Sequence, residues 1–135
     1  IILRPYTGLS IMANYVCNTL SNSGDKLFKR LSPIFKGGLR YMTGSHGTLW
    51  YSVWTEDSGE DFADELQSSA KIKYAWRDGI YDWWHDNDIA VVSMGNSYND
   101  AKNRKDNMKW QNFANYSRRR GSAVTSWART RWTDY

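Results

Sequence analysis

The sequence predicts an α/β fold in a single domain: a mixed sheet, formed by an antiparallel hairpin followed by a βαβαβ unit, with helices packed on it. Three observations lead to this prediction. Strand-like and helix-like segments alternate from residue 48 onward, residues 89–94 are apolar at five of six positions, and two strand-like runs surround the short sequence "GSHG". A chain of 135 residues is long enough to bury one core of this kind.

The N-terminal region predicts two helices. Residues 9–20 place apolar side chains on one broad side of a helix, although their β-branched and aromatic residues also suit a strand. A shorter helix is predicted from Asp25, its N-cap, to Leu31. Pro33 and the glycine pair at 37–38 are expected to end this region.

The next segment predicts a hairpin. Residues 39–43 and 48–55 alternate in the manner of strands, and the four residues between them suit a tight loop. The second run carries apolar residues on both faces, as expected for a strand that is covered on two sides. A helix is expected to follow, with Ser58 or Asp61 as its cap.

The most aromatic stretch of the chain, residues 74–88, predicts a helix with two different faces. One face has the width of a core-facing stripe and carries Ile72, Ala75, Trp76, Gly79, Ile80 and Trp83. Gly79 is expected to let this helix approach a sheet closely. The opposite side carries Tyr74, Tyr81 and His85, which we expect to be exposed or covered by a ligand or partner.

The C-terminal half predicts two further strands and a helix. The apolar run at 89–94 predicts a central strand with a neighbour on each side. A helix is predicted over 99–120, with Gly121 as its C-cap, and residues 122–132 predict the last strand. The expected inward face of that helix consists of Trp110, Phe113 and Ala114. This alternation predicts parallel strands joined by right-handed crossovers.

Charge is distributed unevenly along the chain. Residues 1–55 carry six basic and one acidic side chain (+5), residues 56–88 carry three basic and ten acidic (−7), and residues 89–135 carry nine basic and three acidic (+6). The simpler interpretation is solvated helix faces of alternating sign. The alternative is that the basic C-terminal third faces an anionic partner.

Parallel strands would gather the polar residues that follow them at one edge of the sheet, where ligands of open α/β sheets bind. Carboxylates opposed by amides and arginines could support acid–base chemistry on a sugar or a phosphate ester. The simpler interpretation is that the Asp and Ser residues cap helices. The residues concerned are Glu56, Asp57, Asp61, Asn96, Ser97, Asn99, Asp100, Arg129, Arg131 and Asp134.

The motifs of common cofactors and catalytic sites are missing from the sequence. "MGNSYND" follows a strand with one glycine and matches neither a dinucleotide-binding loop nor a Walker loop, so we expect no cofactor. His46 and His85 are the only histidines and have no further ligand at metal spacing, so no metal site is expected. His46 is interpreted as a polar turn residue. Cys17, the single cysteine, can form no intramolecular disulfide and is expected to be a buried, inert thiol.

The C-terminal segment "GSAVTSWARTRWTDY" resembles the last barrel strand of some hexosaminidase-type (β/α)₈ glycosidases, in which a "TxW" segment lines a sugar pocket. The resemblance implies that Trp127 lines a sugar site. It covers about fifteen residues, and a whole barrel takes about 250 residues, so the family itself is not adopted.

Three functional hypotheses from different classes follow. Aromatic rings with polar tips favour recognition of a polysaccharide or glycan. A secreted basic toxin or effector acting on a cell envelope or nucleic acid is the second, and a structural or assembly subunit is the third. The glycan-binding candidates are Tyr74, Tyr81, His85, Trp127, Glu56, Asp57, Asn96, Asn99 and Asp100. The basic patch for an anionic partner consists of Lys102, Arg104, Lys105, Lys109, Arg118, Arg119, Arg120, Arg129 and Arg131.

The compartment is only weakly indicated. The chain starts at Ile1 without an initiator Met or a signal peptide, which predicts a processed mature chain or a fragment and slightly favours secretion. Its longest apolar run, at 89–92, is far too short to predict a transmembrane segment. The expected partner is a glycan or another protein, and the surface aromatics also leave oligomerisation open.

Overall fold

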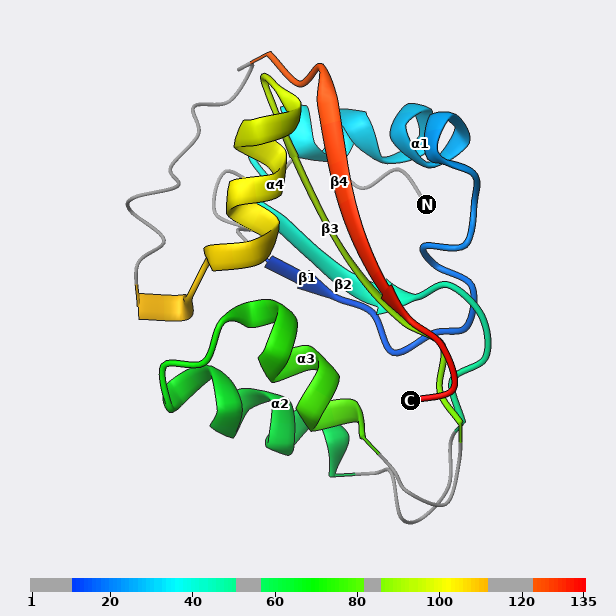
Figure 1. The fold of residues 1–135 in the computed structure, drawn as a ribbon, viewed down its shortest axis with the longest axis vertical. Coiled ribbons are helices and arrows are strands. Elements are labelled where there is room, and N and C mark those ends of the chain that lie inside the picture. Colours follow the sequence, from blue (N-terminus) through cyan, green and yellow to red (C-terminus); the bar gives the residue numbers. More distant parts are fainter. Residues whose placement is uncertain (1–10, 51–56, 82–85, 112–122) are drawn as a thin grey trace.

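The computed structural model describes residues 11–50, 57–81, 86–111 and 123–135, and it forms an α/β fold with helices packed on a mixed sheet (Figure 1). This confirms the fold class that the sequence predicts. The elements in chain order are β1 (Ile11–Ala13), α1 (Gly24–Lys36), β2 (Tyr41–Ser45), α2 (Ser58–Gln67), α3 (Ile72–Ile80), β3 (Ile89–Gly95), α4 (Tyr98–Asn107) and β4 (Ser126–Trp132). None of these helices is both long and apolar enough to cross a membrane.

The described strands form a sheet in the order β1-β2-β3-β4. β1 and β2 are parallel, whereas β3 runs antiparallel to both β2 and β4. The prediction of parallel strands from residue 48 onward is therefore wrong. Hydrophobic patterning cannot distinguish the two directions, because a strand that is buried on both faces has the same apolar run in either orientation. The parallel pair of the described sheet is instead β1 and β2, which α1 connects.

β3 is the central strand, as predicted. All seven of its residues are buried, and it pairs with β2 on one side and with β4 on the other. Its alternate residues contribute to two separate cores. Ala90, Val92 and Met94 pack with α1, whereas Ile89 and Val91 pack with α3 and its surroundings.

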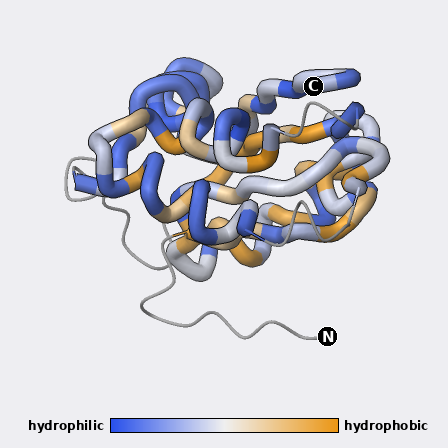
Figure 2. Tube along the Cα trace, turned by 90° about the horizontal axis from the view of Figure 1, so that it is seen from below, coloured by the Kyte–Doolittle hydropathy of each residue, from blue (hydrophilic) through white to orange (hydrophobic). Residues whose placement is uncertain are grey.

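The helices therefore cover both faces of the sheet. Leu27, Leu31 and Phe35 turn the apolar side of α1 to one face. α3 packs on the other face, and the described members of its predicted stripe are buried: Ile72, Ala75, Trp76, Gly79 and Ile80. Trp83 lies outside the described residues. α4 shares the face of α3, because the buried Tyr41 hydroxyl on that face donates to the Lys105 carbonyl over 2.7 Å. Figure 2 shows the hydrophobic segments mostly inside this layered body and hydrophilic ones at its outer turns.

The N-terminal predictions need two corrections. Residues 11–13 of the predicted first helix form β1 instead, since pairing with β2 overrides a weak helical pattern of β-branched and aromatic residues. Pro33 does not end α1, which continues to Lys36 and loses only the hydrogen bond that a proline cannot donate. Gly38, at φ 115°, follows the end of the helix as predicted.

The predicted hairpin is also wrong. Gly44 and Ser45, expected in its loop, belong to β2, and residues 48–50 form no strand. Residues 51–55 of its second strand lie outside the described residues. The antiparallel partner of β2 is β3, which supplies a longer apolar run to pair with.

Helix ends differ from the prediction as well. Asp25, Ser58 and Asp61 are not caps: Ser23 precedes α1 and Asp57 precedes α2, neither with a capping side-chain hydrogen bond. α4 ends at Asn107 rather than near 120, and Trp110, expected to face inward, is 53% exposed. Phe113, Ala114 and Gly121 lie outside the described residues.

Candidate functional site

An open groove of about 400 Å³ lies along the first half of β4, at the edge of the described sheet. We call it the β4 groove; its lining residues are Tyr98, Thr125, Ser126, Trp127, Ala128 and Arg129. Tyr98, the first residue of α4, is 59% exposed, and Trp127 is half-buried. Trp127 and Arg129 were among the predicted residues. Tyr98, Thr125 and Ser126 were missed, because only folding brings the start of α4 beside the start of β4.

A short hydrogen-bonded loop between β3 and α4 fixes one wall of this groove. The Asp100 amide donates to the Ser97 hydroxyl, and the Asn96 amide donates to the Asp100 carboxylate, both over 3.1 Å. Thr125 joins this loop to β4 by donating from its hydroxyl to the Asn96 carbonyl over 2.7 Å. Ser97 and Asp100 thus cap the start of α4, which confirms the capping interpretation for these two residues. The capped turn holds Tyr98 at the rim of the groove.

Trp127 and Arg129 form the other wall. The Trp127 indole lies directly against Gly24 at the start of α1, where any added Cβ would overlap the ring. Arg129 places its guanidinium carbon 5.6 Å from the centre of that ring, within cation–π range. Its Nη1 donates to the carbonyls of Leu20 and Asn22 over 2.9 and 2.8 Å. Both side chains are therefore held by contacts with the segment that leads into α1.

A second aromatic surface lies along α3, beside Tyr135. Its residues are Tyr74, Arg77, Asp78, Tyr81 and Tyr135, and we call it the tyrosine cluster. Tyr74 is 37% and Tyr81 is 56% exposed. Arg77 lies 4.7 Å from the Tyr74 ring and 5.8 Å from that of Tyr135, and Tyr81 meets Tyr135 edge to face at 5.4 Å. Asp78 binds Arg77 at 2.7 Å.

Tyr74 and Tyr81 thus have the exposure predicted for them, while the third member of the predicted surface, His85, lies outside the described residues. Both exposed rings nevertheless already contact other side chains of the protein. Lys73 lies 4.8 Å from the Tyr74 ring in addition to Arg77, so two cations approach the π-system that a ligand would need.

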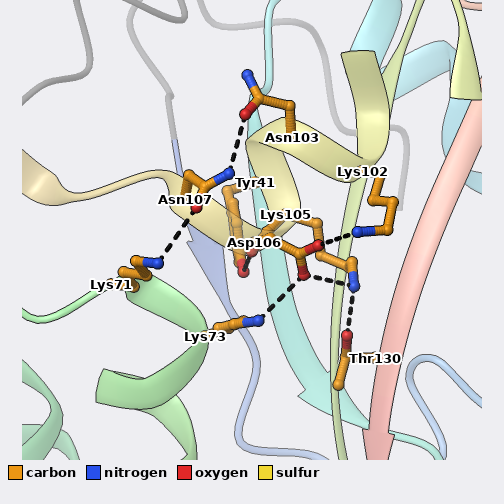
Figure 3. Close-up of polar contacts among 9 residues, drawn as sticks. All are labelled: Tyr41, Lys71, Lys73, Lys102, Asn103, Lys105, Asp106, Asn107 and Thr130. Carbon is orange, nitrogen blue, oxygen red and sulfur yellow. Dashed lines mark hydrogen bonds and ion pairs between the residues drawn. The ribbon is translucent and has the colours of Figure 1, made fainter. Parts of the chain in front are cut away.

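The predicted basic patch on α4 is largely neutralised by carboxylates of the same helix (Figure 3). Asp106 accepts ion pairs from Lys73, Lys102 and Lys105 at 3.1, 2.9 and 2.7 Å. We call these four residues the lysine–aspartate network. Arg104, which is buried, pairs with Asp100 at 3.1 Å. Lys105 is buried too and also donates to the Thr130 hydroxyl.

This network alters the titration of its central carboxylate. Burial acts to raise the pKa of Asp106, but hydrogen bonds from Lys105, Lys102 and Lys73 outweigh burial and hold that pKa well below its usual range. Three other described residues belong to the predicted patch. Lys109 forms an isolated β-bridge with Lys71, Arg129 lines the β4 groove, and Arg131 is exposed on β4. The last three members, Arg118, Arg119 and Arg120, lie outside the described residues.

The predicted gathering of polar residues at one sheet edge is wrong, because the strands are antiparallel. Asn96 and Asn99 follow β3 at one end of the sheet and are exposed. Asp134 follows β4 at the opposite end, where its amide donates to Asp88 just before β3. Asp57 is exposed at the start of α2, and Glu56 lies outside the described residues. The described members of this group therefore do not gather at one edge of the sheet.

The histidine and the cysteine of the described chain do not lie in the β4 groove. His46 Nε2 is 3.1 Å from the Trp132 carbonyl, which ties the end of β2 to the end of β4. Cys17 is exposed, contrary to the buried thiol that its apolar surroundings in the sequence predicted; its Sγ accepts from the Leu49 amide at 3.2 Å. Within the described ranges, no three His, Cys, Asp or Glu side chains lie close enough together to hold a metal ion.

The fold and the groove together define an α/β domain with an aromatic and cationic groove at the edge of a mixed sheet. The chain belongs to the DUF6345 family, a domain of unknown function, whose family model matches residues 7–132. No curated protein and no solved structure matches the chain.

Proposed function

We propose that this domain recognises carbohydrate and that the β4 groove is its binding site. The observation that carries the proposal is that Tyr98 and Trp127, from different elements, line one open groove together with the hydroxyl-bearing residues Thr125 and Ser126. A flat aromatic face suits the apolar side of a sugar ring, and nearby polar groups supply the directional hydrogen bonds. The groove combines both kinds of group within a few residues of β4.

The tyrosine cluster is less suited to the same task. A sugar that stacked on Tyr74 would have to displace Arg77 or Lys73 from the ring, and Tyr81 is engaged by Tyr135. Lost cation–π contacts would offset much of the stacking energy, since each is worth about 0.5–1 kcal/mol at an exposed site. We therefore assign the ligand to the β4 groove rather than to this cluster.

The alternative of a basic effector that binds nucleic acid has less support among the described residues. Binding along a phosphate backbone requires a continuous track of available cations. On α4, however, Lys102 and Lys105 share one carboxylate and Arg104 has another.

A pair of tyrosine variants tests the proposal. Tyr98→Ala removes an exposed ring from the groove, and Tyr81→Ala removes a ring of nearly equal exposure, 56% against 59%, from the tyrosine cluster. Both should fold as the wild type does, because neither ring is in a core. The proteins are screened on a printed glycan array, and the affinity for the best-bound glycan is then measured by calorimetry.

We expect Tyr98→Ala to weaken binding by about tenfold or more and Tyr81→Ala to leave it unchanged. The reverse pattern would assign the glycan to the tyrosine cluster and would contradict the groove. Failure of the wild-type protein to bind any glycan would overturn the proposal. A change confined to self-association in Tyr81→Ala, with no glycan bound, would favour the assembly hypothesis instead.

A further inference from the structure

The described cations of α4 and of β4 differ in whether a carboxylate lies beside them. Those of α4 are paired with Asp100 or Asp106. On β4, Arg129 and Arg131 form no ion pair with any residue that the structure describes, although they are two positions apart on the same face of the strand. The groove therefore contains an arginine whose counter-ion is not supplied by the described chain.

The hydrogen bonds of Arg129 leave one side of its guanidinium available. Nη1 is occupied by the carbonyls of Leu20 and Asn22. Nε and Nη2 donate to no described residue, and they form the edge of the guanidinium whose two parallel N–H groups match the oxygens of a carboxylate or a sulfate. Two main-chain anchors also fix the plane of the group in advance, which reduces the entropy lost when an anion binds.

The surroundings of Arg129 favour an incoming anion. Burial lowers the pKa of Arg129, and the neighbouring charge of Arg131 lowers it further. Both effects mean that the positive charge is held at a cost in free energy, because water is partly excluded and a like charge is close. An anion in the β4 groove would offset both costs by supplying the opposite charge, which a neutral ligand cannot supply.

We infer that the ligand of the β4 groove is an acidic sugar, whose carboxylate or sulfate group is bound by Nε and Nη2 of Arg129 while its ring packs beside Trp127 and Tyr98. This inference rests on the proposed carbohydrate function and narrows it. A single anionic group is favoured over a nucleic acid because, among the described residues, Arg129 is the cation that lines the groove and Arg131 is its neighbour on β4, which together form no extended track.

The test compares acidic sugars with their neutral counterparts. The probes are trigalacturonic acid with its methyl ester, for the carboxylate, and 3′-sulfated lactose with plain lactose, for the sulfate. Binding is measured by calorimetry to the wild-type chain and to three variants: Arg129→Lys, which keeps the charge and loses the bidentate edge; Arg131→Gln, which removes the neighbouring charge; and Lys36→Gln. Lys36 is an exposed cation at the far end of α1, so it serves as the matched control.

We expect the acidic member of at least one pair to bind about tenfold or more tightly than its neutral partner, as for a charge-assisted hydrogen bond. Arg129→Lys should abolish most of this preference, so that the acidic and the neutral member of each pair bind with nearly equal affinity. Arg131→Gln should reduce the preference by a smaller factor, and Lys36→Gln should not change it. If Arg129→Lys fails to fold, the preference of the wild-type protein and its response to Arg131→Gln still decide the question.

The outcomes separate this inference from the function on which it rests. Equal affinity for acidic and neutral sugars, lost in Tyr98→Ala, would leave the carbohydrate function standing and overturn the acidic ligand. Absence of any sugar binding would overturn both. A third outcome is that a uridine oligonucleotide binds more tightly than any of the sugars, with an affinity that falls steeply as salt rises because binding releases several counterions from its phosphates. That result would assign the groove to nucleic acid and overturn both the carbohydrate function and the acidic ligand.

Discussion

Gly79 allows α3 to lie unusually close to α2, and its replacement by alanine should separate the two helices. A Cβ at Gly79 would lie 2.7 Å from both the Cα and the backbone nitrogen of Phe62, well inside an ordinary contact of about 3.5–4 Å. Backbone atoms cannot rotate out of the way as the end of a side chain can. Overpacking of this kind costs about 1–3 kcal/mol, against a gain of about 1 kcal/mol for alanine over glycine inside a helix. Because the clash is with backbone atoms, we take the upper part of this range, about 2–3 kcal/mol, and expect the free energy of unfolding to fall by about 1–2 kcal/mol.

Gly59 in α2 is the matched control. A Cβ at Gly59 meets no atom within 4 Å, so Gly59→Ala should gain helix propensity without a clash and raise the free energy of unfolding by a few tenths of a kcal/mol. Urea unfolding of the wild type and both variants, followed by circular dichroism, measures the two changes. Opposite signs are the expected result. An equally stable or more stable Gly79→Ala protein would refute the close approach of α2 and α3.

Three further predictions follow from the packing and the charges. Trp76→Ala should lower the free energy of unfolding by about 3–5 kcal/mol in the same urea assay, because Trp76 is 2% exposed and its Nε1 donates to the Gly44 carbonyl over 3.0 Å. A loss below about 1 kcal/mol would contradict the place of Trp76 in the core. Val91 and Val92, buried in the central strand, should be among the slowest amides in hydrogen exchange, and fast exchange there would contradict the sheet order. Asp106→Asn should cost at least about 2 kcal/mol at pH 7, because it removes the carboxylate that three lysines share. Because the folded pKa of Asp106 is lowered, the stabilisation by its carboxylate is present above the usual carboxyl pKa of about 4 and is lost as pH falls below that value. The difference in unfolding free energy between wild type and Asp106→Asn should therefore stay constant above about pH 5 and shrink between about pH 5 and about pH 2. A difference that does not change on acidification would rule out the ionised network.

The sequence predicts correctly those segments in which the spacing of apolar residues indicates which side chains are buried. The apolar run of β3 and the stripe of α3 are found where they were predicted, because patterning reports directly which side chains leave water. The parallel direction of the later strands and the pairing of residues 39–43 with 48–55 were predicted wrongly. The pattern of apolar residues does not indicate whether neighbouring strands are parallel or antiparallel. A strand as short as Ile11–Ala13 forms because it pairs with β2 rather than because its own residues favour a strand. The glycine at 79 was identified as a point of close approach, but its neighbour is α2 and not the sheet.

The groove could be predicted only in part, for a related reason. Trp127 was singled out from a local sequence pattern, whereas Tyr98 carries no such pattern and reaches the groove only through the capped turn before α4. The availability of Arg129 could not be foreseen either. Its anchors, the carbonyls of Leu20 and Asn22, are 109 and 107 residues away along the chain. Which cations are neutralised depends on such long-range contacts and not on the local charge count.

Folding in fact rearranges the charge blocks of the sequence. Lys73 is a cation of the acidic middle segment, yet it pairs with Asp106, a carboxylate of the basic C-terminal third, so each neutralises the other where α3 meets α4. The acidic side chains of α2, by contrast, form no ion pair with a described residue, and α2 lies on the opposite face of the sheet from α1. Negative charge is thus left on the α2 face and positive charge at Arg129 and Arg131. A field of this shape would repel an anionic ligand from the α2 side and attract it toward the β4 groove, so rising salt should slow its association while leaving the contacts at Trp127 intact.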